Sequence, residues 1–163
     1  TPGEYKNIYK SFLKDDTVYY VSEHRGSYTN KDEIKNLYFK NPDFVIFAIS
    51  ITRFAAKKAI EDLFKEGIKV SLVNILWIKP LKISKKSYDN LKESKFGGVV
   101  MDDDYTTGVA KSIANDINIK TNKKMITMGL KDRTAGTAKR LDNLPPSSSE
   151  IYKRIKDIIS SNV

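Results

Sequence analysis

The stretch FVIFAISI at residues 44–51 decides how this chain folds, because it runs for eight residues without a charge. A continuous apolar run of this length is typical of a strand that is covered on both faces, as in a parallel sheet flanked by helices. A second run, VSLVNILWI at 70–78, has the same character and is stopped by Pro80. The sequence therefore predicts two buried strands.

The segment between these runs has a helical pattern. Thr52 stands where a helix cap is expected, and Gly67 stands where a helix commonly ends. Four apolar residues between them share one helical face: Ala56, Ala59, Ile60 and Leu63. A strand, a helix and a second strand in this order predict a parallel crossover unit.

The same alternation continues to the end of the chain. A short helix is expected at 85–94, a strand at 97–101 and another strand at 125–128. Apolar residues at helical spacing predict the two remaining helices: Val109, Ile113 and Ile117, then Ile151, Ile155 and Ile158. Four strands alternating with four helices predict an α/β fold, a three-layer α/β/α sandwich with a mostly parallel sheet.

The first 42 residues have a different organisation. Helical spacing of apolar residues predicts a helix that stops near Asp15, and TVYYV at 17–21 reads as a short strand. One helix and one strand cannot bury both of their faces, so we expect this segment to pack against another part of the protein or against a partner. The polar stretch from Ser22 to Pro42 is typical of a linker.

Composition narrows the possible functions. The chain of 163 residues carries a net charge of +9 but no cysteine, which excludes disulfides and thiolate metal sites. Lysine pairs at 57–58, 85–86 and 123–124 fall on different predicted elements without interleaved aromatic residues, which disfavours a nucleic-acid partner. No apolar run approaches the roughly 20 residues of a membrane span, and no signal-peptide core is found, so we expect a cytoplasmic protein and no membrane partner.

Few residues in the chain offer catalytic chemistry. His24 is the only histidine, and beside Glu23 and Arg25 it reads first as a solvated or hydrogen-bonded linker residue. Asp102, Asp103 and Asp104 follow a predicted strand and precede a helix. They could bind a metal or carry acid–base chemistry, but acidic groups there more often favour the positive end of the helix or an interface.

The segment DRTAGTAKRLDNLPP at 132–146 separates the last predicted strand from the last helix. About 15 residues without regular structure are unusual in a compact domain unless they are functional or disordered. Leu141 and Leu144 offer apolar anchors, and Arg133 and Arg140 could pair with Asp102 to Asp104 of a neighbouring unit. We expect an ordered docking loop at a subunit or domain boundary.

Together with SEHRGSY at 22–28, LWIKPL at 76–81 and DDDYTTGVAKSIA at 102–114, this segment resembles the carboxy-terminal part of transketolase-like thiamine diphosphate enzymes. The closest likeness is to the beta subunits of 2-oxo-acid dehydrogenase first components. The resemblance implies that residues 1–28 are the tail of a pyrimidine-binding domain, 29–42 a linker and 43–163 the carboxy-terminal domain.

The family's cofactor residues are missing from this chain. The GDG motif of the pyrophosphate-binding domain, which is followed by the asparagine that holds magnesium, does not occur. The glutamate that activates the cofactor would lie before Thr1, and Glu23 does not match it. We therefore expect no catalytic, cofactor or metal residues here, with thiamine diphosphate and magnesium bound elsewhere in the parent enzyme. Relatives often carry glycine at the position of Ser50, which puts a glycine-type turn there in doubt.

The resemblance also implies partners and a substrate class. The expected partners are a second copy of the chain, the pyrophosphate-binding domain or alpha subunit of the parent enzyme, and an acyltransferase core. The loop from Ser22 to Arg25 would face the substrate channel, making Glu23, His24 and Arg25 its candidate residues. Transketolases place a phosphate-binding arginine at the position that aligns best with Glu23, and a carboxylate there would repel a sugar phosphate. The resemblance therefore favours a 2-oxo-acid substrate, unless the loop is shifted so that Arg25 compensates.

Three functions stay open at this point. The first is a noncatalytic structural and assembly domain of a thiamine diphosphate enzyme, either a 2-oxo-acid dehydrogenase beta subunit or a transketolase acting on sugar phosphates. The second is a stand-alone regulatory domain with a ligand at the carboxyl ends of its parallel strands. The third is a basic module that associates with nucleic acid.

Overall fold

The computed structural model describes residues 1–136, 138 and 142–161. The chain divides into two compact units, Thr1–Lys35 and Asn36–Val163.

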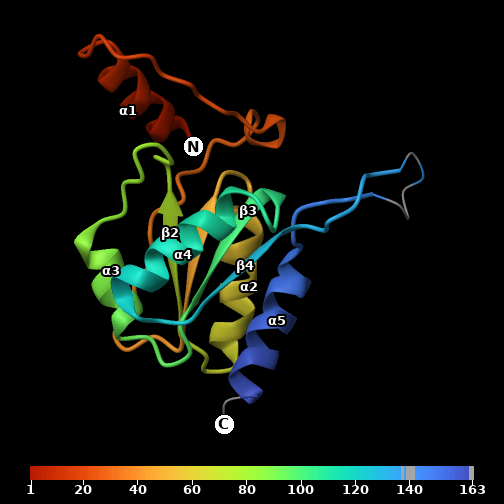
Figure 1. Ribbon diagram of the computed structural model, residues 1–163. Coiled ribbons are helices and arrows are strands. Elements are labelled where there is room, and N and C mark those ends of the chain that lie inside the picture. Colours follow the sequence, from red (N-terminus) through yellow and green to blue (C-terminus); the bar gives the residue numbers. More distant parts are fainter. Residues whose placement is uncertain (137, 139–141, 162–163) are drawn as a thin grey trace. The chain divides into compact units, whose positions relative to one another are not determined.

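The larger unit is built on a four-stranded sheet (Figure 1). Its strands are β1 (Phe44–Ile49), β2 (Val70–Ile75), β3 (Gly98–Tyr105) and β4 (Met125–Leu130). They lie in the order β2-β1-β3-β4, and every neighbouring pair is parallel. The parallel sheet predicted from the apolar runs is confirmed.

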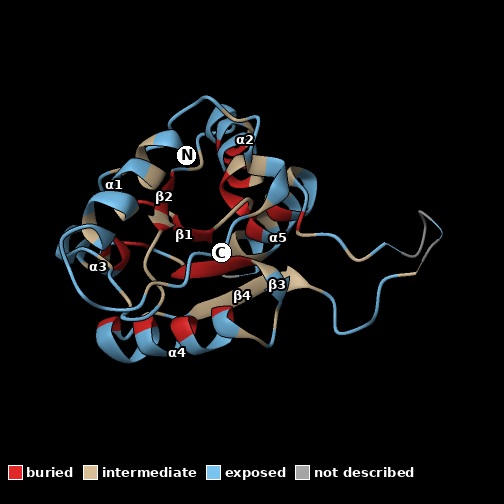
Figure 2. Cartoon of the chain, turned by 90° about the horizontal axis from the view of Figure 1, so that it is seen from above, coloured by how far each residue is buried: buried red, intermediate tan, exposed pale blue. Residues whose placement is uncertain are grey.

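Helices cover both faces of this sheet (Figure 2). They are α2 (Thr52–Lys65), α3 (Lys85–Lys92), α4 (Val109–Thr121) and α5 (Ser148–Ser160). The pair α2 and α5 packs together on one face, while α3 and α4 pack on the other. The result is the predicted three-layer α/β/α sandwich.

Burial explains why β1 has no polar alternation. All six of its residues are at most 5% exposed. Val45, Phe47 and Ile49 join the core that includes Leu91 of α3 and Ile117 of α4. Successive side chains of a strand point to opposite faces, so the other three residues of β1 face the layer of α2 and α5. Both faces of the strand are therefore shielded from solvent.

Two local expectations need correction. Ile51, not Thr52, is the cap of α2, because the Thr52 hydroxyl turns back and donates to the carbonyl oxygen of Ile49 at 2.6 Å. The second strand ends at Ile75 instead of residue 78, because the chain then turns so that Ile78 pairs antiparallel with Leu81. By contrast, Gly67 has the positive φ of +79° expected of a residue that follows a helix.

The smaller unit contains α1 (Pro2–Phe12) and a short 3-10 turn, Arg25–Ser27. The strand predicted at 17–21 is wrong. All residues of this unit are described and none belongs to a strand, so the segment has no partner for ladder hydrogen bonds. Val18 is 98% exposed, and the Asp15 carboxylate instead accepts hydrogen bonds from the Thr17 amide and the Tyr19 hydroxyl.

Two glycines allow a direct test of how closely the backbones approach each other where β3 and β4 begin. Gly97 and Gly67 have nearly the same φ, +81° and +79°. A Cβ at Gly97 would lie 2.1 Å from the carbonyl oxygen of Lys124, whereas a Cβ at Gly67 would meet nothing within 4 Å. Gly67→Ala should cost about 1 kcal/mol of unfolding free energy from φ alone. Gly97→Ala should cost at least about 2 kcal/mol more, because backbone must move.

Urea unfolding of both variants measures this difference. Equal destabilisation by the two substitutions would show that the strands do not approach as closely as described here.

Candidate functional site

The carboxyl edge of the sheet has the topology of a binding or docking site. The chain passes from β1 to β2 on one side and places β3 on the other side of β1. In open parallel sheets, ligands and partners commonly meet the crevice at such a reversal of strand order. Ser50 after β1 and Asp102 to Asp104 in β3 all lie at this edge.

Ser50 shapes the exit from β1. Its φ of +55° is in the left-handed region, so the glycine-type turn forms here with a serine. The Ser50 hydroxyl donates to Asp103 Oδ2 at 3.0 Å, and the Ser50 carbonyl oxygen accepts from Arg53 Nε at 3.0 Å. Arg53 is only 4% exposed. These bonds tie the β1–α2 junction to the end of β3.

The three aspartates have different environments. Asp102 is buried, at 5% exposure, while Asp103 is half-buried and Asp104 is exposed. Burial, then hydrogen bonding with Asp103 and the negative charge of Asp103, raises the pKa of Asp102 to about 6. The Asp104 carboxylate accepts a hydrogen bond from the Tyr105 amide at 2.7 Å. Near neutral pH the buried edge can therefore hold or release a proton.

The edge does not have the geometry of a metal centre. Among the residues that the structure describes, no group of three or more His, Asp or Glu side chains is placed to hold a metal ion. A register irregularity lies between Met101 and Tyr105, in the part of β3 that carries the aspartates. The carboxylates that the structure describes at this edge therefore do not form a magnesium site.

The buried aspartate makes stability depend on pH. An acid whose pKa is about 6 when folded and about 3.8 when unfolded binds its proton more tightly in the folded state. Its stabilising contribution is complete below pH 3.8 and is lost as the pH rises to about 6. Asp102→Asn should remove this dependence of the unfolding free energy on pH and should stabilise the protein by roughly 1–3 kcal/mol at pH 7.

Urea unfolding between pH 4 and pH 7 measures the slope of the unfolding free energy against pH. Asp116→Asn, at an exposed position of α4, is the matched control and should leave the slope unchanged. Parallel stability curves for the wild type and Asp102→Asn would contradict this view of the buried carboxyl.

A second candidate site is formed by the described residues between β4 and α5 (Figure 1). The side chain of Asn143 links the residues before α5 to the residues after β4. Its Oδ1 accepts a hydrogen bond from the Lys131 amide at 3.0 Å. Its Nδ2 donates to the carbonyl oxygens of Lys131 and Arg133 at 2.8 and 2.7 Å. Arg133 Nη2 donates to the carbonyl oxygen of Asp142 at 2.5 Å. We call residues 131–136 and 142–147 the arm. Its base is held by specific hydrogen bonds.

The residues of the arm that the sequence predicts to contact a partner differ in their exposure and in their hydrogen bonds. Leu144 is 69% exposed and free to meet a partner, whereas Pro146 close by is buried. Arg133 bonds within the arm, and its pairing with Asp102 to Asp104 of a neighbouring unit stays a prediction. Arg140 and Leu141 lie outside the described residues. Sequence reasoning missed Asn143, for which the only signal is the preference of asparagine for turns.

The substrate-channel candidates all lie in the smaller unit. His24 Nδ1 accepts a hydrogen bond from the Gly26 amide at 3.0 Å and so fixes the turn that carries Glu23 and Arg25. Glu23 contacts the Tyr28 hydroxyl, and this hydrogen bond raises the pKa of Tyr28. The three candidates are thus neighbours at one turn, and their place in a substrate channel stays a prediction.

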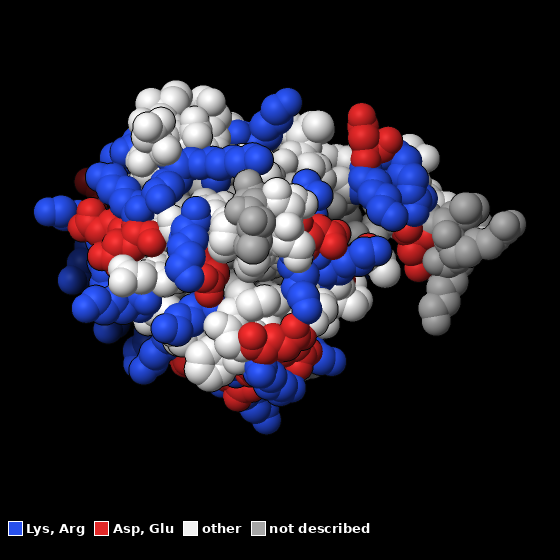
Figure 3. Space-filling view, turned by 90° about the horizontal axis from the view of Figure 1, so that it is seen from below, with Lys and Arg blue, Asp and Glu red and all other residues white. Residues whose placement is uncertain are grey.

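Charge is mixed on the face that Figure 3 shows. Figure 3 shows lysine and arginine side chains scattered among acidic and uncharged ones, with no continuous basic stripe on the face in view. No helix in the described part of the chain is long and apolar enough to cross a membrane.

The fold and its edge define a three-layer α/β domain with a parallel sheet. A family model for the transketolase C-terminal domain matches residues 36–147, and the chain belongs to this family. A search of curated proteins finds no match.

Two solved structures share the fold. One is a split-gene transketolase in an inactive beta4 tetramer, with a TM-score of 0.57, 18% identity and coverage of 72% of this chain and 38% of that chain. The other is the 2-oxoglutarate:ferredoxin oxidoreductase from Magnetococcus marinus with 2-oxoglutarate, coenzyme A and succinyl-CoA bound, with a TM-score of 0.51, 19% identity and coverage of 78% and 19%. This chain therefore spans well under half of the length of either protein.

Proposed function

We propose that this chain is the noncatalytic structural and assembly domain of a thiamine diphosphate enzyme, the beta subunit of a 2-oxo-acid dehydrogenase decarboxylating component. In this role the chain supplies docking surfaces, and the cofactor is held by other parts of the enzyme. The observation that carries the proposal is the match of residues 36–147 to the transketolase C-terminal domain.

Two surfaces support an assembly role. The arm presents Leu144 at 69% exposure on a base that Asn143 holds in place, so an apolar contact is offered without a large loss of entropy on docking. Helix α1 has no buried residue, and Tyr9 and Phe12 are 57% and 47% exposed. Such apolar residues are commonly covered by partner protein.

Glu23 supports a 2-oxo acid as the substrate. The Glu23 carboxylate lies on an exposed stretch of chain beside Arg25. A negative charge in a substrate channel repels a doubly charged sugar phosphate more strongly than a singly charged 2-oxo acid. This part of the proposal depends on the channel position that the resemblance implies.

Isothermal titration calorimetry of the chain with thiamine diphosphate and magnesium tests whether other parts of the enzyme hold the cofactor. We expect no measurable binding, since the family's cofactor motif is missing from the sequence. A micromolar dissociation constant for the isolated chain would contradict the assignment as a noncatalytic domain.

Reconstitution with the remaining domains of the parent enzyme tests the activity. The assembled protein should decarboxylate pyruvate or a branched-chain 2-oxo acid in a thiamine-dependent reaction. Ketol transfer between sugar phosphates without such decarboxylation would instead identify a transketolase.

The same assembly tests the arm. Leu144→Ser should weaken association at least tenfold in sedimentation, since a buried leucine stabilises by roughly 1.5–3 kcal/mol. Ile119→Ser is the matched control, because Ile119 belongs to α4 and is similarly exposed, at 74%. Equal effects of the two substitutions would rule out a specific contact at Leu144.

A further inference from the structure

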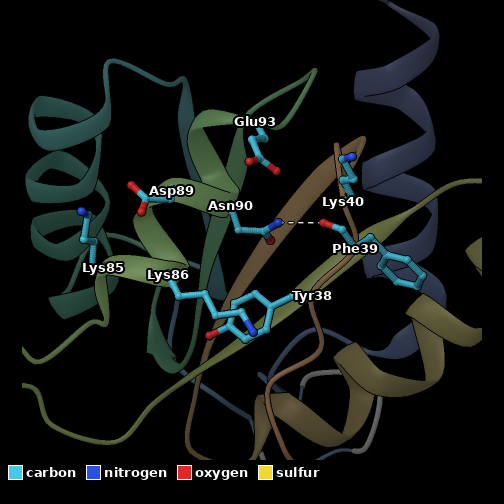
Figure 4. A pocket seen from close by; sticks show the side chains of 8 residues that line it. All are labelled: Tyr38, Phe39, Lys40, Lys85, Lys86, Asp89, Asn90 and Glu93. Carbon is cyan, nitrogen blue, oxygen red and sulfur yellow. Dashed lines mark hydrogen bonds between the residues drawn. The ribbon is translucent and has the colours of Figure 1, made fainter.

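The two edges of the sheet differ in how the rest of the chain covers them. At the β2 edge, Leu37 pairs antiparallel with Leu72 through two backbone hydrogen bonds of 2.8 Å. The residues that follow are also held in place: the Phe39 amide donates to Ser71 Oγ at 3.0 Å, and Asn90 Nδ2 donates to the Phe39 carbonyl oxygen at 2.7 Å (Figure 4). This edge is therefore covered by the chain itself.

The β4 edge has no such cover in the described part of the chain. There β3 is the only strand that pairs with β4, and all six residues of β4 are partly exposed, whereas β1 is buried throughout. The Lys124 carbonyl oxygen accepts a hydrogen bond from the Gly98 amide of β3 at 3.0 Å. Alternate residues of a parallel strand bond to the same neighbour, so the backbone groups of Met125 and Thr127 point to the open side. No other backbone group among the described residues bonds to them.

The sequence of β4 does not prevent a further strand from pairing with this edge. Proteins commonly protect an edge strand with a charged residue, with proline or with a covering segment. The sequence MITMGL at 125–130 contains no charge and no proline. An uncharged edge with unused backbone groups is a template for an added strand.

The smaller unit contains a segment that is suited to such pairing. The sequence TVYYVS at 17–22 is rich in residues that favour strands, and the amides of Val18, Tyr20 and Val21 have no backbone hydrogen-bond partner among the described residues. The Val18 and Tyr20 side chains are 98% and 94% exposed. Tyr19, between them, packs its ring edge-on against Phe12 of α1, with ring centroids 5.6 Å apart. The segment is thus held by α1 through Tyr19, while its backbone and its other apolar side chains remain available.

The charges that border the two segments are complementary. Six uncharged residues separate Asp16 from Glu23, and β4 consists of six uncharged residues between Lys124 and Lys131. When the two segments lie side by side in register, each bordering carboxylate comes opposite a lysine, whichever direction the added strand runs. Opposite charges across a strand pair are favourable, and like charges are unfavourable.

The same bordering charges disfavour the two alternative pairings. A pair of two β4 strands would place lysine opposite lysine, and a pair of two 17–22 segments would place carboxylate opposite carboxylate. From these observations we propose that residues 17–22 of one copy of the chain add as a fifth strand to the open edge of β4 of a second copy.

This contact is distinct from the docking surfaces proposed above, which are the arm and α1. It joins the edge of β4 to residues 17–22, and it requires only copies of the 163-residue chain. Its test therefore does not depend on which reaction the parent enzyme catalyses.

Sedimentation equilibrium of the 163-residue chain, in about 150 mM salt to screen diffuse attraction, measures the association. We expect reversible association with a dissociation constant of about 1–100 µM. Amide hydrogen exchange locates the contact in the same samples. The amides of residues 18–21, Met125 and Thr127 should exchange at least tenfold more slowly in the associated protein than in the dilute monomer.

A substitution at Tyr20 separates backbone pairing from contact through the side chain. Tyr20→Pro removes the backbone donor at a position that is 94% exposed, so the fold should persist while association weakens at least tenfold. Tyr20→Val is the matched control, because it keeps the amide and a residue that favours strands. This control should change the dissociation constant less than threefold.

Charge exchange tests the pairing of the borders. One variant combines Lys124→Glu with Lys131→Glu, and a second variant combines Asp16→Lys with Glu23→Lys. Each variant alone should associate at least tenfold more weakly than the wild type, because like charges then face each other. A mixture of the two should recover association, since the 17–22 segment of the second variant complements the β4 edge of the first.

Four results would overturn the proposal. The first is a monomer at every concentration up to about 200 µM. The second is equally slow exchange of the named amides in the monomer, which would indicate pairing within one chain. The third is an equal loss of association in Tyr20→Pro and Tyr20→Val, which would indicate a side-chain contact. The fourth is a mixture of the two charge variants that associates no better than either alone. The contact at Leu144 is tested separately by Leu144→Ser in the assembled enzyme.

Discussion

The rest of the larger unit depends on the burial of β1 on both of its faces. Each of its six residues is at most 5% exposed, and the strand pairs with β2 on one side and β3 on the other. A parallel strand in this position needs helices above and below it, because the crossover connections must return over a face of the sheet. The two helical layers follow from this one strand.

The parallel arrangement also gathers polar residues at one edge. All four strands end on the same side, so Ser50 and Asp103, far apart in the sequence, meet within hydrogen-bond distance. Arg53, buried one turn further on, holds the carbonyl oxygen of Ser50. This edge is therefore a fixed junction, and its carboxylates are set by the fold before any partner binds.

The order and type of the elements could be predicted because apolar periodicity is a local property. The runs at 44–51 and 70–78 predicted β1 and β2, and every predicted helix is found. The TVYYV prediction failed because β-propensity cannot supply a partner strand. The end of β2 was missed for a related reason: the pairing of Ile78 with Leu81 is not visible in the apolar pattern.

The site was less predictable than the fold. Asp102 to Asp104 could be placed at a strand end, but the burial of Asp102 alone depends on tertiary packing. Asn143 gave almost no sequence signal, since an asparagine becomes informative only when its partners are known. Its side chain holds the base of the arm. Side chains whose roles depend on distant backbone atoms are the ones that sequence patterns miss.

The central claim is that this domain acts by docking, through the arm and α1. Amide hydrogen exchange, compared between the isolated chain and the assembled enzyme, tests it most directly. The account predicts that residues 142–146 and α1 exchange at least tenfold more slowly in the assembly, while the buried strand β1 exchanges slowly in both. Unchanged exchange in the arm and α1 on assembly would contradict the claim.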